Sequence, residues 1–324
     1  MRISFNRPSA DRKQAGFNMV ELMVALFLGL FVTTAVLQIF VGAKRVYEFQ
    51  QELSRIQENG RFAIGFLTRD IRQADYWGCM SEGSSIVDHA GNDVGRGIEG
   101  FDAVAAGTSG YAPALGPLAD GFLLRRALPT GIKVKVPSPF SAIVQMDSTR
   151  GFELGDALII SDCSYGASFV IDKNVNSSDK VVHHGTPGGL GIPGKDGYDI
   201  YRSASTRYWL RTGVSGEPAL VRGAAADAWD TGGDELLEGV ENVQILYGVD
   251  SSGNKTPNYF VPADQVADMG AVVSVQLHLL IRSLRDNMLD KPQAIVYYGE
   301  SRVNLDRRLR KSFTSTVAIR NRLE

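Results

Sequence analysis

The distribution of apolar and polar residues separates the first part of the chain from everything that follows. Between Phe17 and Ala43, a run of 27 residues contains a single charged side chain, Glu21. A helix of this length measures about 40 Å, which exceeds the roughly 30 Å of the hydrocarbon core of a bilayer. The pattern therefore predicts a membrane-spanning helix over residues 17–43.

The helix is predicted to continue past the apolar run. No proline interrupts this part of the chain, and apolar residues recur at intervals of three or four among charged ones. We expect this amphipathic stretch to cover residues 44–76 and to stop before Gly78. Its apolar residues Phe62, Phe66 and Ile71 are expected to lie in the core of the following domain.

From residue 77 onward the pattern changes to short β-type runs separated by Gly, Pro, Asn, Asp and Ser. Because no long helix alternates with these runs, we predict an α+β fold for the chain, with one long helix packed on antiparallel sheet in a domain covering residues 77–324. Long glycine-rich loops are expected at 81–119 and 173–203. The predicted strands are 121–126, 132–136, 142–146, 156–161, 168–172, 206–212, 219–222, 240–249, 271–283, 294–298 and 312–320.

Composition excludes several classes of protein. With 44% apolar and 22% charged residues and a net charge of −2, the chain is neither a disordered polyelectrolyte nor a polytopic membrane protein. The charge is unevenly placed, because residues 1–16 carry a net charge of +3. The positive-inside rule places this leader in the cytoplasm, so everything after the apolar helix is expected in the periplasm.

The apolar run could belong to a cleaved signal peptide or to an uncleaved signal anchor. The residues before and including Ala43 imitate a signal-peptidase site, but the run is too long for a signal-peptide core, which usually has 7–15 residues. A plain signal anchor remains open. It explains every feature except the local sequence around Gly16.

That local sequence, KQAG at 13–16 followed by FNMVE at 17–21, resembles the class III signal of type IV pilins and type II secretion pseudopilins. The resemblance covers about 30 residues and implies cleavage by a prepilin peptidase after Gly16. It also implies N-methylation of the new terminal residue, Phe17.

Glu21 needs a partner if it stays charged in lipid, where an unpaired carboxylate costs on the order of 3 kcal/mol. In a pilin-like filament the implied partner is the new terminal amine of a neighbouring subunit, which would register stacked helices. The alternative is that Glu21 reaches the membrane interface or takes up a proton, and contributes nothing to assembly.

The remainder of the chain carries a second resemblance. Its stretches are 69–79 (RDIRQADYWGC), 160–163 (ISDC), 237–250 (LEGVENVQILYGVD) and 313–322 (FTSTVAIRNR). Together they resemble the PilW family of type IV pilus minor pilins. The J pseudopilin of type II secretion is the alternative, although it is usually shorter and lacks such long loops.

The PilW resemblance implies a structural subunit and no enzyme. Such subunits form a tip or priming complex that initiates pilus assembly and supports adhesion and twitching motility. The implied partners are other minor pilins, the major pilin, the prepilin peptidase, the inner-membrane assembly platform and a tip adhesin. A signal-anchored periplasmic enzyme or binding protein is the alternative from another class.

Cys79 and Cys163 are the two cysteines of the chain. With only four histidines, they leave few ligands for a zinc site, so the choice lies between one disulfide and two separate thiols. Because the predicted topology places both residues in an oxidising compartment, we predict a Cys79–Cys163 disulfide. Two buried free thiols are the alternative.

One stretch imitates a phosphate-binding loop. Residues 189–195 satisfy G-x-x-x-x-G-K, but Asp196 stands where the motif needs a Ser or Thr hydroxyl for magnesium. We therefore expect a flexible loop and no nucleotide. The adjacent His183 and His184 would point to opposite faces of a strand, so no metal site is expected there.

Two other groups of side chains could bind a ligand, either calcium or DNA, although the sequence favours neither. Calcium binding is an open alternative for four oxygen-bearing residues in one loop: Asp172, Asn174, Asn176 and Asp179. A basic carboxy-terminal cluster could contact DNA, but a solvated edge or a contact with an acidic partner subunit is favoured. The cluster consists of Arg302, Arg307, Arg308, Arg310, Lys311, Arg320 and Arg322. We expect no cofactor, no catalytic residue and no nucleic-acid partner.

Overall fold

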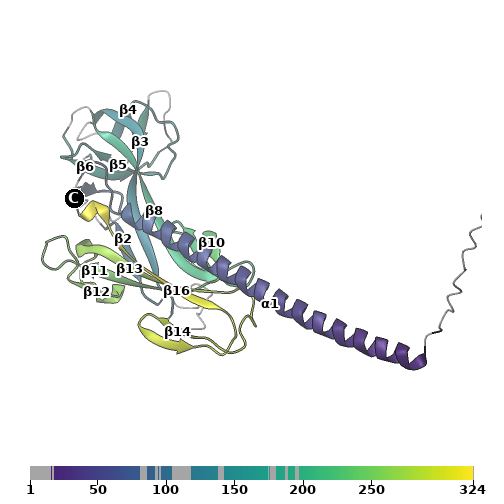
Figure 1. Cartoon of the computed structure of the whole chain (residues 1–324). Coiled ribbons are helices and arrows are strands. Elements are labelled where there is room, and N and C mark those ends of the chain that lie inside the picture. Colours follow the sequence, from purple (N-terminus) through teal and green to yellow (C-terminus); the bar gives the residue numbers. More distant parts are fainter. Residues whose placement is uncertain are drawn as a thin grey trace, which may run out of the picture. The chain divides into compact units, whose positions relative to one another are not determined.

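The protein is described from a computed structural model (Figure 1). The described residues are 16, 18–80, 86–91, 94, 96–103, 118–137, 142–173, 175, 180–186, 189–193 and 197–323. The chain divides into two compact units, Met1–Gln51 and Glu52–Glu324, and each is described by itself. We call the second one the β-rich unit.

A single helix, α1 (Met19–Arg72), spans 54 residues and begins in the first unit. Every residue from Met19 to Tyr47 is exposed, and this part is long and apolar enough to cross a membrane. Two of its polar groups are satisfied within the helix, because the hydroxyls of Thr33 and Thr34 donate to the carbonyls four residues earlier at 2.8 Å. The first half of α1 thus fits a membrane anchor.

The second half of α1 belongs to the β-rich unit and packs along one stripe, formed by Ile56, Gly60, Ala63, Leu67, Asp70 and Ile71. Gly60 lies against the ring of Phe313, which leaves no room for a side chain at that position. Ile71 is buried as expected, and Phe66 is partly buried against Tyr208. The prediction for Phe62 is wrong, because half of its surface is exposed. It precedes Ala63 by one residue, which turns it about 100° away from the buried stripe.

The helix ends at Arg72, four residues earlier than expected. The backbone N–H groups of Gln73 and Ala74 donate to carbonyls three residues back, which tightens the last turn. Asp75 then adopts a left-handed conformation with φ of 61°. A residue in this conformation commonly terminates a helix, so the stop comes before Gly78.

The larger sheet contains ten strands. They are β1 (Ile86–Asp88), β2 (Ile98–Phe101), β3 (Gly121–Pro137), β4 (Ile143–Met146), β5 (Ala157–Ser161), β6 (Gly166–Val170), β7 (Val181–His183), β8 (Asp199–Thr212), β9 (Pro218–Gly223) and β10 (Asp234–Glu238). The long strands β3 and β8 pair with each other along most of their lengths. On its other side β8 meets β5 and then β9, and β3 meets β2 and then β4.

One end of this sheet closes on itself. β4 pairs with β7, β5 pairs with β6, and a bridge between Ile171 and His184 connects the ends of β6 and β7. The resulting ring of β3, β4, β7, β6, β5 and β8, here called the barrel lobe, surrounds a core that includes Met146, Phe169 and Tyr198. Figure 1 shows β3, β4, β5 and β6 gathered at one end of the β-rich unit.

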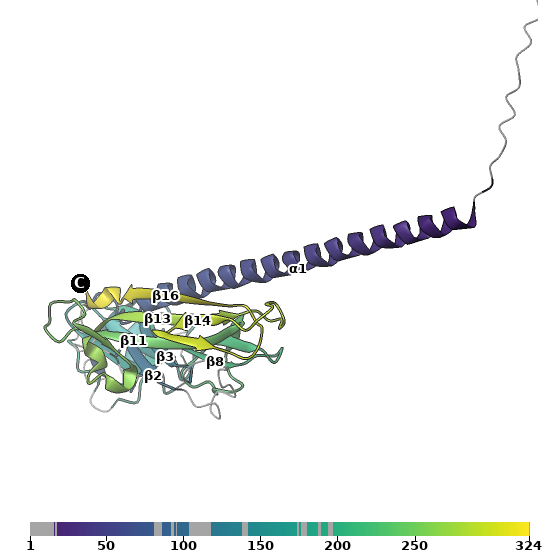
Figure 2. The same ribbon diagram turned by 60° about the horizontal axis from the view of Figure 1, so that its bottom comes forward.

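The other end of β3 and β8 faces α1 and a second sheet. Its four strands are β11 (Val240–Val249), β12 (Tyr259–Val261), β13 (Val272–Arg282) and β16 (Arg310–Ala318), in the order β12-β11-β13-β16. Figure 2 shows β11, β13 and β16 side by side. A separate hairpin consists of β14 (Ala294–Tyr297) and β15 (Glu300–Val303). Short 3₁₀ turns cover Ala263–Gln265, Met269–Ala271 and, as η4, Arg320–Arg322.

The α+β prediction is confirmed: one long helix packs on largely antiparallel sheet, and β1 with β6 is the parallel pair among the described strands. The predicted strands 121–126 and 132–136 form the single strand β3. A register shift between Pro129 and Ile132 accommodates the proline and Gly131, whose φ is 72°. Strands β1, β2 and β7 lie within segments that we expected to be loops. They have three or four residues each, so long-range pairing outweighs local sequence there.

Candidate functional site

The predicted processing and assembly residues lie at the start of α1. Gly16 is exposed, with open space around it, whereas Phe17 and residues 1–15 lie outside the described residues. Glu21 occupies the first turn of α1, where an acidic side chain interacts favourably with the helix dipole. It is exposed and has no ion pair within the described part of the chain. Its proposed partner in a neighbouring subunit stays a prediction.

The structure contains the predicted bond between Cys79 and Cys163, whose Cα atoms lie 4.7 Å apart. Cys79 follows the end of α1 by seven residues, and Cys163 lies in the turn between β5 and β6, with φ of 71°. Asp162 stabilises this turn by accepting hydrogen bonds from the backbone of Ser164 and Tyr165. The bond therefore fastens the segment after the helix to the barrel lobe.

Asp75 connects the end of α1 to two distant segments. Its carboxylate accepts hydrogen bonds from the Trp77 indole at 2.7 Å, from the backbone of Gly97 at 3.0 Å and from the guanidinium of Arg322. A side chain at position 97 would collide with Asp75. The Asn321 amide donates to the Ala74 carbonyl at 2.8 Å. Two of the stretches singled out in the sequence, 69–79 and 313–322, thus meet at this helix-exit junction.

Asp70 is a buried charge on the helix face that contacts the large sheet. It accepts a hydrogen bond from the Tyr208 hydroxyl and lies 3.7 Å from Arg126 and 4.0 Å from Arg222. Burial, followed by the hydrogen bond to Asp70, raises the pKa of Tyr208. Arg222 also lies over the ring of Phe66, with 5.6 Å to its centroid. These contacts fix the rotation of the helix against β8 and β9.

A second buried ion pair lies within the four-stranded sheet and joins Glu241 of β11 to Arg310 of β16. The Arg310 Nε and Nη2 atoms lie 2.6 and 3.1 Å from the two carboxylate oxygens of Glu241. Arg310 also contacts Asp306, and its hydrogen bond to that carboxylate lowers the pKa of Asp306. Both Arg310 and Glu241 are almost completely buried.

The expectation of a solvated basic edge is wrong for three members of the carboxy-terminal cluster. Arg310 pairs with Glu241, Arg308 contacts Glu217 at 3.1 Å, and Arg322 contacts Asp75. Their partners come from segments far away in the sequence. Three of the seven cations in the cluster are therefore occupied in holding the fold together.

Asp120 lies at the junction between the two sheets. Its carboxylate accepts hydrogen bonds from the backbone of Ala103 at 3.0 Å and of Ile245 at 2.9 Å. Burial raises the pKa of Asp120 to about 7, although the two backbone hydrogen bonds act to lower it. Asp102 lies nearby and caps the 3₁₀ turn at Ala263, and its pKa is raised by burial as well.

This raised pKa predicts a pH dependence of stability. The unfolded chain binds the Asp120 proton only below its ordinary pKa of 3.8, whereas the folded chain retains it up to about pH 7. The free energy of unfolding should therefore fall as pH rises from about 4 to about 7, by at most about 4 kcal/mol from this group. Urea denaturation across that range should show a shallower slope for Asp120→Asn than for the wild type. Equal slopes would contradict the prediction.

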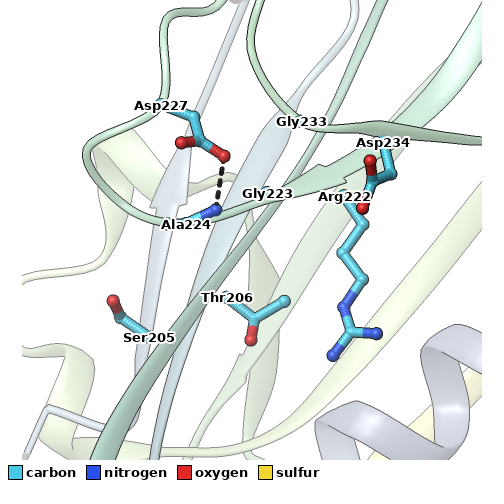
Figure 3. Close-up of a pocket in the computed structure, with 8 residues that line it drawn as sticks. All are labelled: Ser205, Thr206, Arg222, Gly223, Ala224, Asp227, Gly233 and Asp234. Atoms are coloured by element: carbon cyan, nitrogen blue, oxygen red, sulfur yellow. Dashed lines mark hydrogen bonds between the residues drawn. The ribbon is translucent and has the colours of Figure 1, made fainter.

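A surface cavity of about 430 Å³ opens between β8, β9 and the start of β10. Figure 3 shows its residues, among them the Ser205 and Thr206 hydroxyls and the carboxylates of Asp227 and Asp234. Asp227 is engaged, because it accepts a hydrogen bond from the backbone of Ala224 at 2.7 Å. The described lining residues contain no histidine, lysine or cysteine that could activate a hydroxyl.

The remaining candidate ligand sites of the sequence are only partly described. Asn174, Asn176 and Asp179 of the calcium alternative lie outside the described residues, as do Gly194, Lys195 and Asp196 of the phosphate-loop imitation. His184 is buried against the ring of Phe169, whereas His183 is partly exposed. Within the described residues no three His, Cys, Asp or Glu side chains group as metal ligands.

Comparison with known proteins finds a match for about the last third of the chain. Residues 207–321 match the family model PilW, described as type IV pilus-assembly protein W. The match runs from the second half of β8 through both strands of the hairpin to η4, so it includes the Glu241–Arg310 pair and Asn321 of the helix-exit junction. No curated protein and no solved structure matches the chain.

Proposed function

Since the chain is a PilW-family protein of the type IV pilus, we propose that it is a minor pilin. It is made as a precursor, cleaved after Gly16, and anchored in the inner membrane by the first half of α1. It then joins other minor pilins in a tip or priming complex that initiates pilus assembly. The proposed role is structural and not enzymatic, and it serves adhesion and twitching motility through the filament.

The observation that carries this proposal is the composition of α1. One uninterrupted helix has a first half that is exposed and apolar and a second half whose inner stripe belongs to the core of the β-rich unit. A cleaved signal peptide would discard the first half. Cleavage before the helix keeps it and gives a subunit that can move from a bilayer into a filament core without refolding.

The proposed orientation places the leader in the cytoplasm and the β-rich unit in the periplasm. The positive charge of residues 1–16 supports it. The Cys79–Cys163 bond supports it as well, because disulfides form and persist in oxidising compartments. PilW membership implies contact with other pilus assembly components. The partners that we propose are the minor pilins, the major pilin, the prepilin peptidase, the assembly platform and a tip adhesin.

Glu21 supplies the test of assembly. We expect Glu21→Ala to be cleaved and methylated normally, as measured by mass spectrometry of the new amino terminus at Phe17. Its incorporation into sheared pili should fall at least tenfold, because the charge pairing that registers neighbouring helices is lost. Thr33→Val is the matched control, since the Thr33 hydroxyl is already satisfied within α1. Unchanged incorporation of Glu21→Ala would refute the registration role.

Experiments on the wild-type chain also distinguish the proposed function from its two alternatives. Co-purification of the wild-type chain with other minor pilins is the expected result, whereas recovery with a secretion-system exoprotein would favour a J-type pseudopilin. A chain that prepilin peptidase does not cut would instead favour a signal-anchored periplasmic enzyme or binding protein.

A further inference from the structure

The four-stranded sheet ends in β16, which pairs with β13 on one side only. Figure 2 shows β16 as the outermost strand beside β13. The odd-numbered residues form this ladder, because backbone bonds from Ile319 to Val273 and from Ser283 to Leu309 continue it at its two ends. In an antiparallel ladder, successive residues direct their backbone groups to opposite sides. The even-numbered residues of β16 therefore direct their N–H and C=O groups away from β13.

The first of these outward positions is occupied within the chain. The Arg310 N–H donates to the Gln293 side-chain oxygen at 2.8 Å, and the Gln293 amide donates to the Arg310 carbonyl at 3.1 Å. This side chain takes the place that a neighbouring strand would have. The backbone groups of the next four even-numbered residues have no hydrogen-bond partner in the part of the chain that the structure describes. These residues are Ser312, Thr314, Thr316 and Ala318.

We call residues 312–318 the open edge. Proteins usually protect edge strands by short length, charges, prolines or bulges. β10 follows this rule, with five residues, three of them acidic, and a register shift. β12 has only three residues. The open edge contains no charge and no proline, keeps one register throughout, and exposes Thr314, Thr316 and Ala318. It is therefore accessible to another strand.

The side chains along the open edge indicate which strand fits it. On the face toward α1, Phe313 is partly exposed although its ring contacts Gly60. Ile64, one turn after Gly60 on the same side of α1, is partly exposed as well. The opposite face presents Thr314 and Thr316. Because residues directly opposite each other in a sheet share a face, a strand with apolar residues on one face and hydroxyl residues on the other complements this edge.

The charge next to the open edge adds one requirement. Lys311 is exposed at its beginning, and its ammonium lies 5.7 Å from the centroid of the Phe313 ring. Within the described residues it has no carboxylate partner. A carboxylate at the end of an incoming strand would supply one, whereas a charge in the middle of that strand would meet only neutral side chains.

The repeat of the backbone groups limits the occupant to a polypeptide. Donors and acceptors recur on one side of a strand about every 7 Å, a spacing that an extended chain reproduces. A second copy of β16 fits poorly. β16 runs in the direction of α1, since Phe313 lies at Gly60 and Asn321 at Ala74. Antiparallel pairing of two copies would therefore set their helices in opposite directions, which is incompatible with the proposed anchoring of both in one membrane.

We propose that the open edge of β16 receives an added β-strand from a different protein subunit. The strand is uncharged along its middle, alternates apolar residues with Ser or Thr, and carries a carboxylate where it meets Lys311. It extends the four-stranded sheet by main-chain hydrogen bonds to Ser312, Thr314 and Thr316. That this subunit belongs to the same filament rests on the proposed function, whereas the strand pairing does not.

Fluorescence anisotropy of the full chain in detergent micelles tests the pairing, with a fluorescein-labelled peptide of alternating valine and threonine that ends in glutamate as the probe. We expect saturable binding. The threonines share a face with Thr314, so in antiparallel pairing their backbone nitrogens face β16. Methylation of the threonine nitrogens should weaken binding at least tenfold. Methylation of the valine nitrogens, which face away, is the matched control and should change affinity less than twofold.

A variant of the chain gives the reciprocal test. Thr314→Pro removes one outward N–H and no bond of the ladder with β13, and proline is tolerated at such edge positions. It should bind the unmethylated peptide at least tenfold more weakly. Thr314→Val keeps the N–H and should bind within twofold of the wild type. The urea midpoint of the proline variant shows whether it folds.

Absence of binding to the wild type, or equal affinities of the two methylated peptides, would overturn the proposal. The peptide comparison does not depend on the folding of any variant. Recovery in sheared pili tests the identity of the partner: Thr314→Pro should be recovered at least tenfold less than Thr314→Val, with normal cleavage after Gly16. Equal recovery would exclude a partner in the filament. Failed cleavage of the wild-type chain would instead remove the proposed function and leave the strand pairing to the peptide result.

Discussion

Glu241→Ala is expected to lower the free energy of unfolding of the β-rich unit by about 3–5 kcal/mol. The substitution removes one of the two carboxylate partners of the buried Arg310 guanidinium, and breaking a buried ion pair is strongly destabilising. Asp306 still contacts Arg310, which favours the lower end of this range. Urea denaturation of the full chain in detergent measures the change, because all three tryptophans lie in the β-rich unit and report its unfolding.

The matched control for Glu241 is Glu300. It also pairs with an arginine, Arg302, but 68% of its side chain is exposed. Exposed ion pairs contribute little, so Glu300→Ala should change the free energy of unfolding by less than about 1 kcal/mol. If the two substitutions had equal effects, the burial of the Glu241–Arg310 pair would not matter for stability.

Removal of the disulfide should lower the free energy of unfolding by about as much as Glu241→Ala. The bond closes a loop with a sequence separation of 84 residues. In the chain-entropy model, closing a loop of this length in the unfolded chain adds about 4–5 kcal/mol to the free energy of unfolding. We expect Cys79→Ala/Cys163→Ala to unfold at correspondingly lower urea concentration. Wild-type protein under a reducing agent should behave similarly.

Two observations control the disulfide experiment. The double variant should show the same urea midpoint with and without reductant, because it has no bond to lose. Denatured, unreduced wild-type protein should show no reactive thiol. Two reactive thiols per chain would mean that the bond does not form in solution and would restore the alternative of free cysteines.

Periodicity and turn signals predicted much of the fold because these elements are long or strongly patterned. The strand at 240–249 has the predicted bounds, and the helix is correct except at its ends. The error at Phe62 has a geometric cause. The spacing of Phe62 relative to Phe66 resembles a buried stripe, but Gly60 and Ala63 define the face that packs against the strands. Only the packing partner, Phe313, distinguishes the two faces.

The charged residues were harder to interpret from sequence. Arg310 and Arg322 belong to what reads as one basic cluster, yet their partners lie 69 and 247 residues away, respectively. Charge density along a chain carries no information about such distant pairing. Cys79 and Cys163 were easier, since two cysteines allow one pairing within the chain.

The position of the Cys79–Cys163 bond also determines how the β-rich unit responds to mechanical load. When tension is applied between α1 and β16, the covalent path crosses from Cys79 directly to Cys163. The 83 residues between them therefore cannot be pulled out while the bond is intact. Fully extended, they would add roughly 280 Å to the length of the chain. A single covalent link thus shields β3, β4 and β5 of the barrel lobe from extension, whereas β6, β7 and β8 lie outside the closed loop.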